Sequence, residues 1–420
     1  MTRAWSERIE QHYAVRLPDE LRYWFDAMLW RDPLLAEFRH PLTPSQLLDP
    51  PPGVIWAGFM LPDTLPLIGN EYGDWLCMRV SADGRVSEII CWNHGGGDWI
   101  PYGRRLAEAL LYDGLGVAGW GVVTSDELPS APAPLLWARD RLLRAAGLRV
   151  EEPCDGRLDG VSMEALLRAG WAEVVIRRDR ALAFLNNPLK THSDPRIARQ
   201  MNVGWEPEWV RWLFDTELIP PGSRPVLAQF FDQSLDQLLH QDWRAAEQEA
   251  LRVLQLREDL GWPWDLAGWA AERRQDWPAA VEYYLRGLPT SLFADESIRF
   301  RTHWFPEGYG KFSAARLHAL QTHLPARWLR DPYLQLFWEN EARSLRQRLS
   351  QHWLRRAEHH LGCQQYQQAY HCFYRAGWDC GLNDLDAYAE ILDGIGTTAT
   401  AAGASALARL ANLHRRFLLA

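Results

Sequence analysis

The sequence predicts an α+β domain at the N-terminus, with a mixed sheet and flanking helices, followed by an all-α helical-repeat domain. Two observations lead to this prediction: residues 1–120 show helix-like apolar patterns, then a run of strand-like ones and a closing helix, and a motif recurs after 34 residues in the second half. We therefore divide the 420-residue chain into an α+β domain over residues 1–120, a linker and mixed helical and hairpin region over 121–225, and a repeat domain over 226–420.

The N-terminal elements follow from apolar spacing and turn residues. One helix is predicted to begin at Leu17–Glu20, where Pro stands in the first turn and acidic residues follow it. Ser81–Arg85 is a hairpin turn signal between two apolar runs. The other expected elements are helices over Trp5–Tyr13, 41–48, Arg104–Tyr112 and Leu135–Ala146, and strands over Val54–Phe59, Leu67–Ile68, Trp75–Val80 and Val86–Trp92.

A hexapeptide recurs in the helical half of the chain. Gln241–Ala246 (QDWRAA) returns as Gln275–Ala280 (QDWPAA), at the 34-residue period of a tetratricopeptide helix pair. Small residues such as Gly268 stand where the two helices of a pair must approach closely, and the alanine that ends each copy is expected to be buried. This stretch resembles the tetratricopeptide family, with a third copy beginning at Trp353.

Composition narrows the function classes. No apolar run reaches the roughly 18–20 residues that span a bilayer, and the N-terminus lacks the apolar core of a secretory signal, so we expect a cytoplasmic protein without a membrane span. The net charge of −9 argues against nucleic-acid binding, which needs a basic surface. Residues 1–120 hold 16 acidic and 10 basic side chains, a net charge of −6 that would attract a basic partner, although solubility alone is an alternative explanation.

A series of short motifs suggests a family for the first domain. In order, they are Leu17–Leu21 with Trp24 and Phe25, Leu65–Asn70, Gly73–Met78, Trp92–His94, and Asp98 with Trp99. With this order and spacing, residues 5–115 resemble the SUKH superfamily, known from yeast cell-wall assembly regulators and bacterial toxin-immunity proteins. Two departures concern the binding face: Met28–Pro33 replaces the family's run of glycines, and Gly95–Gly97 is unusual. The resemblance implies a domain that binds a protein partner rather than one that performs chemistry.

We therefore predict a non-catalytic protein-binding protein of the immunity or adaptor type, whose partner is a protein such as a basic toxin. One alternative is a cytoplasmic regulatory scaffold of cell-wall or envelope synthesis, with a cell-envelope regulatory protein as its partner. A second is an enzyme with an unrecognised site, for which His94 and Asp98 are candidates without an evident nucleophile or metal set. The six cysteines form no CxxC pair and are expected to be reduced, mostly buried thiols, and we expect neither a cofactor nor a metal.

Two partner-binding surfaces are predicted. An antiparallel pairing of two strands would bring the turn before one strand and the loop after the other to one end of the sheet. The second surface is the groove of the repeats. The candidate residues are Glu71, Asp74, Trp92, His94, Asp98 and Trp99 for the first surface, and Asp265, Trp269, Glu272 and Arg273 for the second. In the alternative interpretation, Trp92 and Trp99 are core residues, and Asp74 caps a turn.

Overall fold

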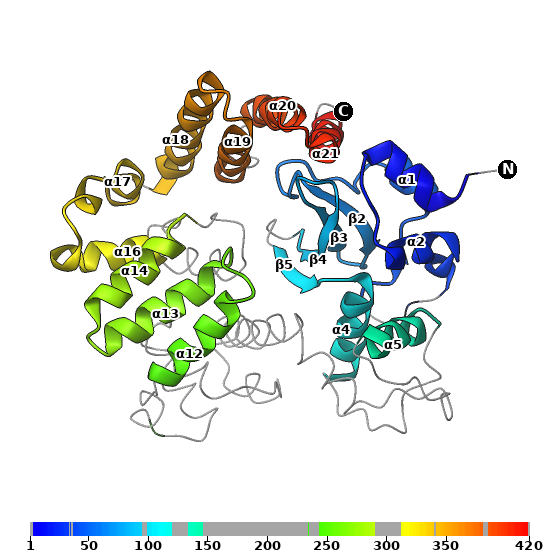
Figure 1. Ribbon diagram of the computed structural model, residues 1–420, viewed down its shortest axis with the longest axis horizontal. Coiled ribbons are helices and arrows are strands. Elements are labelled where there is room, and N and C mark those ends of the chain that lie inside the picture. Colours follow the sequence, from blue (N-terminus) through cyan, green and yellow to red (C-terminus); the bar gives the residue numbers. More distant parts are fainter. Residues whose placement is uncertain are drawn as a thin grey trace. The chain divides into compact units, whose positions relative to one another are not determined.

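The protein forms two compact units, which are Met1–Glu173 together with Ser350–Ala420, and Val174–Leu349. The structure, a computed structural model (Figure 1), describes residues 3–32, 34, 37–94, 99–119, 133–145, 234, 243–289, 312–339, 342–380 and 385–418. The predicted repeat region 226–420 is thus divided between the two units. The predicted domain boundaries after residues 120 and 225 lie outside the described residues.

The first unit contains a five-stranded sheet in the order β1–β2–β3–β4–β5, and every neighbouring pair is antiparallel. The prediction of a mixed sheet is therefore wrong: only five or six residues separate consecutive strands from β2 to β5, whereas a parallel pair would need a long crossover. The strands are β1 (His40–Pro41), β2 (Thr64–Gly69), β3 (Trp75–Val80), β4 (Val86–Trp92) and β5 (Trp99–Gly103). The predicted pairing of β3 with β4 is confirmed. The strand predicted over Val54–Phe59 is wrong, because this segment forms turns.

Helices of the first unit are joined to neighbouring segments through buried carboxylates. The Glu20 carboxylate accepts the backbone N–H of Ala107 at 2.7 Å, which satisfies a free donor in the first turn of α4. The Asp113 carboxylate, also on α4, accepts the N–H of Phe38 at 3.0 Å. The N-terminal helices are α1 (Trp5–Tyr13), α2 (Asp19–Asp26), the 3₁₀ turn η1 (Leu29–Arg31), α3 (Pro44–Leu48), α4 (Leu106–Gly119) and α5 (Ala133–Ala145).

Three C-terminal helices belong to the same unit as the sheet. They are α19 (Tyr366–Cys380), α20 (Leu385–Ala401) and α21 (Ser405–Leu418). The last helix, α21, packs on α20 and also contacts α1, so the first and last helices of the chain lie side by side (Figure 1). None of the described helices of the chain is both long enough and apolar enough to cross a bilayer.

The second unit is helical in its described residues. Its helices are α12 (Trp243–Leu254), α13 (Gly261–Arg273), α14 (Trp277–Gly287), α16 (Phe312–Ala319), the 3₁₀ turns η3 (Gln321–His323) and η4 (Trp328–Arg330), α17 (Pro332–Glu339) and the start of α18 (Ala342–Gly362). Helices α13 and α14 form a hairpin in which Gly268 faces the ring of Tyr284. Ala280 is fully buried, as predicted, while the side chain of Ala246 lies outside the described residues.

The same turn follows the first helix in three helical hairpins. In each, one residue adopts the left-handed conformation: Gln275 (φ 63°), Gln364 (φ 57°) and Gly403 (φ 76°). The next residue donates its N–H to the carbonyl five positions earlier, which satisfies a helix-end acceptor in the Schellman manner. These bonds join Asp276 to Ala271 (2.9 Å), Gln365 to His360 (2.9 Å) and Ala404 to Ala399 (2.8 Å). Hairpins α13–α14, α18–α19 and α20–α21 therefore share one local geometry.

Candidate functional site

A compact turn connects β2 to β3 at one end of the sheet. The Asn70 side-chain oxygen accepts the N–H groups of Tyr72 and Asp74, both at 2.9 Å, and the Asn70 N–H donates to the Asp74 carbonyl at 3.0 Å. Gly73 takes φ 91°, a backbone conformation that residues with a Cβ rarely adopt. The turn fixes the backbone of Tyr72, whose side chain is 71% exposed.

Asp74 joins this turn to the loop after β4. One carboxylate oxygen accepts the His94 N–H at 2.8 Å and lies 3.1 Å from His94 Nδ1. The other oxygen accepts Asn70 Nδ2 at 3.0 Å. A carboxylate at Nδ1 favours the tautomer with the proton there, which leaves the lone pair of the neutral ring on Nε2. The predicted meeting of Asp74 and His94 at one end of the sheet is thus observed, while Asp98 lies outside the described residues.

Three tryptophans form a row across the sheet at this end. The strand register pairs Trp75 with Trp92 and Trp92 with Trp99. The side chains of Trp92 and Trp99 are only 1% and 2% exposed, and Trp92 Nε1 donates to the Phe59 carbonyl at 2.8 Å. Such burial argues against direct partner contact, because a partner can reach only what solvent can reach. The core interpretation therefore describes these two residues better.

An exposed tryptophan, which sequence reasoning missed, lies against the row. The Trp56 ring packs at 6.4 Å from the Trp92 ring and is 42% exposed. Its indole N–H donates to the Gly53 carbonyl at 2.8 Å, so the ring is held in place although it faces solvent. The apolar run around Trp56 suggested a strand, and nothing in the local sequence distinguishes an exposed ring from a buried one.

Carboxylates gather around the turn that carries Tyr72. Glu37 accepts Asn70 Nδ2 at 3.1 Å, and Glu71 forms an exposed ion pair with Arg39 at 3.6 Å. With Asp74, three carboxylates and one arginine come together around the turn. We call Glu37, Trp56, Glu71, Tyr72, Asp74 and His94 the acidic end of the sheet. It combines apolar area for contact with an excess of negative charge.

The predicted groove residues have mostly internal partners. Asp265, Trp269 and Glu272 are buried, and only Arg273 is exposed, with its guanidinium 5.6 Å from the Trp269 ring. The Asp265 carboxylate accepts the Ser313 hydroxyl at 2.5 Å. Glu272 accepts the Tyr284 hydroxyl at 3.0 Å and forms an ion pair with Arg316. Burial, with the Glu272 charge second, raises the pKa of Tyr284. These contacts hold α13, α14 and α16 together.

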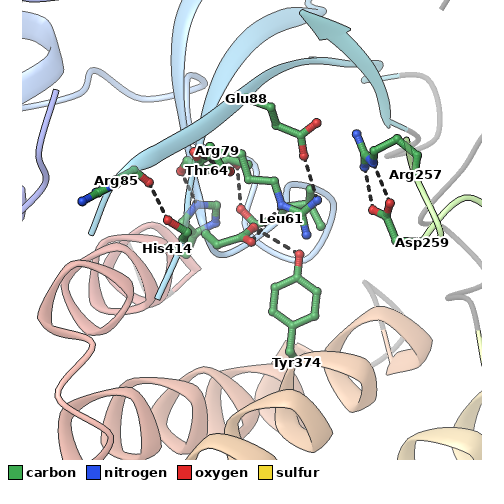
Figure 2. A network of polar contacts seen from close by, with 12 residues as sticks. Leu61, Thr64, Arg79, Arg85, Glu88, Arg257, Asp259, Tyr374 and His414 are labelled. Atoms are coloured by element: carbon green, nitrogen blue, oxygen red, sulfur yellow. Dashed lines mark hydrogen bonds and ion pairs between the residues drawn. The ribbon is translucent and has the colours of Figure 1, made fainter. Parts of the chain in front are cut away.

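A buried polar cluster joins the sheet to α19, and sequence reasoning did not single it out. The Asp63 carboxylate accepts hydrogen bonds from Arg79 Nε at 3.0 Å and from the Tyr374 hydroxyl at 3.1 Å. Tyr374 lies 311 positions after Asp63 in the chain. Arg79 Nη1 also donates to Glu88 at 3.1 Å. Figure 2 shows Glu88 and Tyr374 on opposite sides of Arg79. Because these charges are paired and hydrogen-bonded, the cluster has the properties of a structural contact between sheet and helix.

Comparisons of this chain with protein-family models, curated proteins and solved structures found no match. Within the described part of the chain, no group of three or more His, Cys, Asp or Glu side chains could hold a metal ion.

Proposed function

We propose that this chain is a non-catalytic protein-binding protein, and that the acidic end of the sheet binds a basic partner. One observation carries the proposal: Tyr72, which is 71% exposed, stands on a hydrogen-bonded turn beside the Asp74 carboxylate, and Trp56, which is 42% exposed, packs against Trp92 at the same end of the sheet. Trp and Tyr are enriched at protein interfaces and dominate their binding energy. A pre-formed surface also lowers the entropy lost on binding.

The charge of this end indicates the chemistry of the partner. Glu71 pairs with Arg39, and Glu37 and Asp74 both accept from Asn70, within a region whose formal net charge is −6. Such a surface attracts cationic proteins over long range, and its aromatic rings can stack on arginine or lysine side chains. A basic toxin, held in the way that the resemblance to SUKH immunity domains implies, is the partner that we propose.

We also propose that the helical hairpins are divergent tetratricopeptide-like repeats. Support comes from the shared turns at Gln275, Gln364 and Gly403 and from the close approach of Gly268 to Tyr284. Such hairpins bury their apolar faces by stacking on neighbours, which suits a scaffold. Since three of the four predicted groove residues are buried, we favour the sheet end as the main binding surface.

Two alternatives use the same residues. A cytoplasmic regulatory scaffold of cell-wall or envelope synthesis would present the same surface to a cell-envelope regulatory protein. An enzyme would use the Nε2 atom of His94, oriented by Asp74, as a base. His94→Gln separates the enzyme from the binding protein, because it would abolish catalysis but leave binding by Trp56 and Tyr72 largely intact.

The test has two steps, which are capture of partners by full-length baits and measurement of association rates with the captured proteins. Wild type and Glu71→Lys are used to capture partners from the native lysate, and association with each captured protein is measured over a salt series. We expect association with the authentic partner to slow by up to about tenfold at low salt for Glu71→Lys, and less at high salt. Tyr72→Ala should weaken affinity by about 30-fold, if Tyr72 is an interface anchor worth about 2 kcal/mol.

The matched control is Glu7→Lys on α1. Glu7 and Glu71 are both exposed carboxylates paired with an arginine, at 3.7 and 3.6 Å, and their side-chain exposures are 61% and 59%. The two variants therefore change the net charge equally, but only one changes the acidic end. Equal effects of both variants, with Tyr72→Ala unchanged, would show that binding occurs elsewhere on the chain.

A further inference from the structure

The last helix buries a mostly apolar face, and its polar contacts with the N-terminal part of the first unit come mostly from basic groups. Arg409 Nη1 donates to the carbonyls of Gln11 and His12, at 2.5 and 2.6 Å, in the last turn of α1. Such carbonyls carry the negative end of the helix dipole, so a cation binds well there. Arg416 reaches the exposed Asp49 at 3.8 Å.

His414 occupies the buried centre of this contact. Its side chain is fully buried, and Nε2 lies 3.3 Å from the carbonyl oxygen of Thr64, the first residue of β2 (Figure 2). A carbonyl only accepts, so Nε2 must donate and the lone pair lies on Nδ1. Among the described residues, no group forms a hydrogen bond with buried Nδ1. A proton added to Nδ1 would therefore create a buried cation without a hydrogen-bond partner.

The surrounding charges do not compensate for that cation. Asp63, next to Thr64, is the nearby acid, and its carboxylate already accepts Arg79 and Tyr374. The other titratable and charged groups bonded or paired at this contact are His12, Arg409, Arg16 with Asp83, Arg85 with Asp83, Arg416 with Asp49, and Arg415 with Asp393 of α20. Helices α1 and α20 also carry Glu7, Arg8, Glu10, Asp386 and Glu390. His12 is a second titratable base at this contact. Burial first, then Arg409 and Arg416, lowers the pKa of His12.

We propose that α21 is an acid-sensitive latch: protonation of His414, aided by protonation of His12, releases α21 from α1 and from the start of β2. At neutral pH both histidines are uncharged and the arginines of α21 hold the helix on backbone carbonyls and on Asp49. In acid, His414 and His12 add two positive charges beside Arg409 and Arg416. Helix α21 then undocks while the sheet remains folded.

Hydrogen exchange of the full-length protein tests the latch. Burial lowers the pKa of docked His414 to about 4, while a released histidine keeps its ordinary value of 6.5. Between pH 7.5 and 5.0 this difference shifts docking by about 30-fold toward release. His414→Gln places an amide N–H where Nε2 stands and cannot titrate. At each pH, exchange of residues 405–418 is compared between wild type and His414→Gln, so that intrinsic exchange rates cancel.

We expect amides of α21 in wild type to lose about 30-fold more protection than those of His414→Gln on going from pH 7.5 to 5.0. His359 is an exposed histidine on α18, so the control variant His359→Gln should behave as wild type. Identical pH profiles for wild type and His414→Gln would overturn the latch. So would a parallel loss of protection in β3 and β4, which would indicate global unfolding. If His414→Gln does not fold at pH 7.5, His12→Gln tests the latch instead. The latch requires that amides of α21 in His12→Gln lose less protection in acid than those of wild type, although the difference is smaller than for His414→Gln.

Discussion

Replacing Gly268 with alanine should destabilise the second unit. A Cβ at Gly268 would stand 2.4 Å from the nearest atom of the Tyr284 ring, well inside van der Waals contact. Tyr284 is fully buried and donates to Glu272 at 3.0 Å, so its ring has little room to move. Overpacking of this kind costs about 1–3 kcal/mol, and the short distance places it near 3. The higher helix propensity of alanine offsets about 1 kcal/mol of this cost, so we expect the free energy of unfolding to fall by about 2 kcal/mol.

The assay is urea and thermal unfolding, with hydrogen exchange of α13 and α14 used to assign the transition to this unit. A loss of about 2 kcal/mol should lower the Tm of a unit of this size by about 4–8 °C. Gly362→Ala is the control, because no atom lies within 4 Å of the added Cβ at the end of α18. That variant should be neutral or slightly stabilised. A Gly268→Ala protein as stable as wild type would refute the close packing of α13 on α14.

Two further changes test the first unit. Burial raises the pKa of Asp113 from 3.8 to about 7, so its ionisation opposes folding, and wild-type stability should fall as pH rises from about 4 to 7. Asp113→Asn should therefore be the more stable protein at pH 8 by up to a few kcal/mol, and a stability difference that does not change with pH in urea unfolding would contradict this. Thr43→Ala removes a capping box, in which Thr43 Oγ1 accepts the Gln46 N–H at 3.2 Å, and should cost about 1 kcal/mol in unfolding free energy, whereas Thr43→Ser should retain it.

Local signals predicted the central hairpin because the turn and the strand pattern agree. Gly84 adopts φ 80° between β3 and β4, and the two strands have the predicted bounds. The same local reasoning failed at Val54–Phe59, where Gly53 and Gly58 also take positive φ and bend an apolar run into turns. It also missed β5, since Pro101 lies in the middle of that strand. There, pairing with β4 outweighs the poor strand propensity of proline.

The candidate site was only partly predictable, because exposure is a tertiary property. Strand register alone brings the turn of Asp74 to the loop of His94, and that part of the expectation was correct. Whether a tryptophan at the end of a strand faces solvent depends on segments distant in sequence. The Phe59 carbonyl, 33 residues away, accepts the indole N–H of Trp92, while Trp56 stays half-exposed above it. The charge excess could be counted from the sequence, but the aromatic contact residues could not be identified from it.

The contacts of α19 and α21 decide how binding should be mapped. Asp63 receives the Tyr374 hydroxyl from 311 residues away, and the Thr64 carbonyl faces His414 from 350 residues away. A fragment of residues 1–120 would leave Asp63 without one of its two partners and would uncover apolar surface that α21 now covers. Breaking buried polar contacts in this way is strongly destabilising. Loss of binding by such a fragment would therefore not distinguish a missing contact surface from a damaged fold. Charge reversal at Glu71 in the full chain avoids this ambiguity, because Glu71 is exposed and lies at the opposite end of β3 from the hairpin tip near α21.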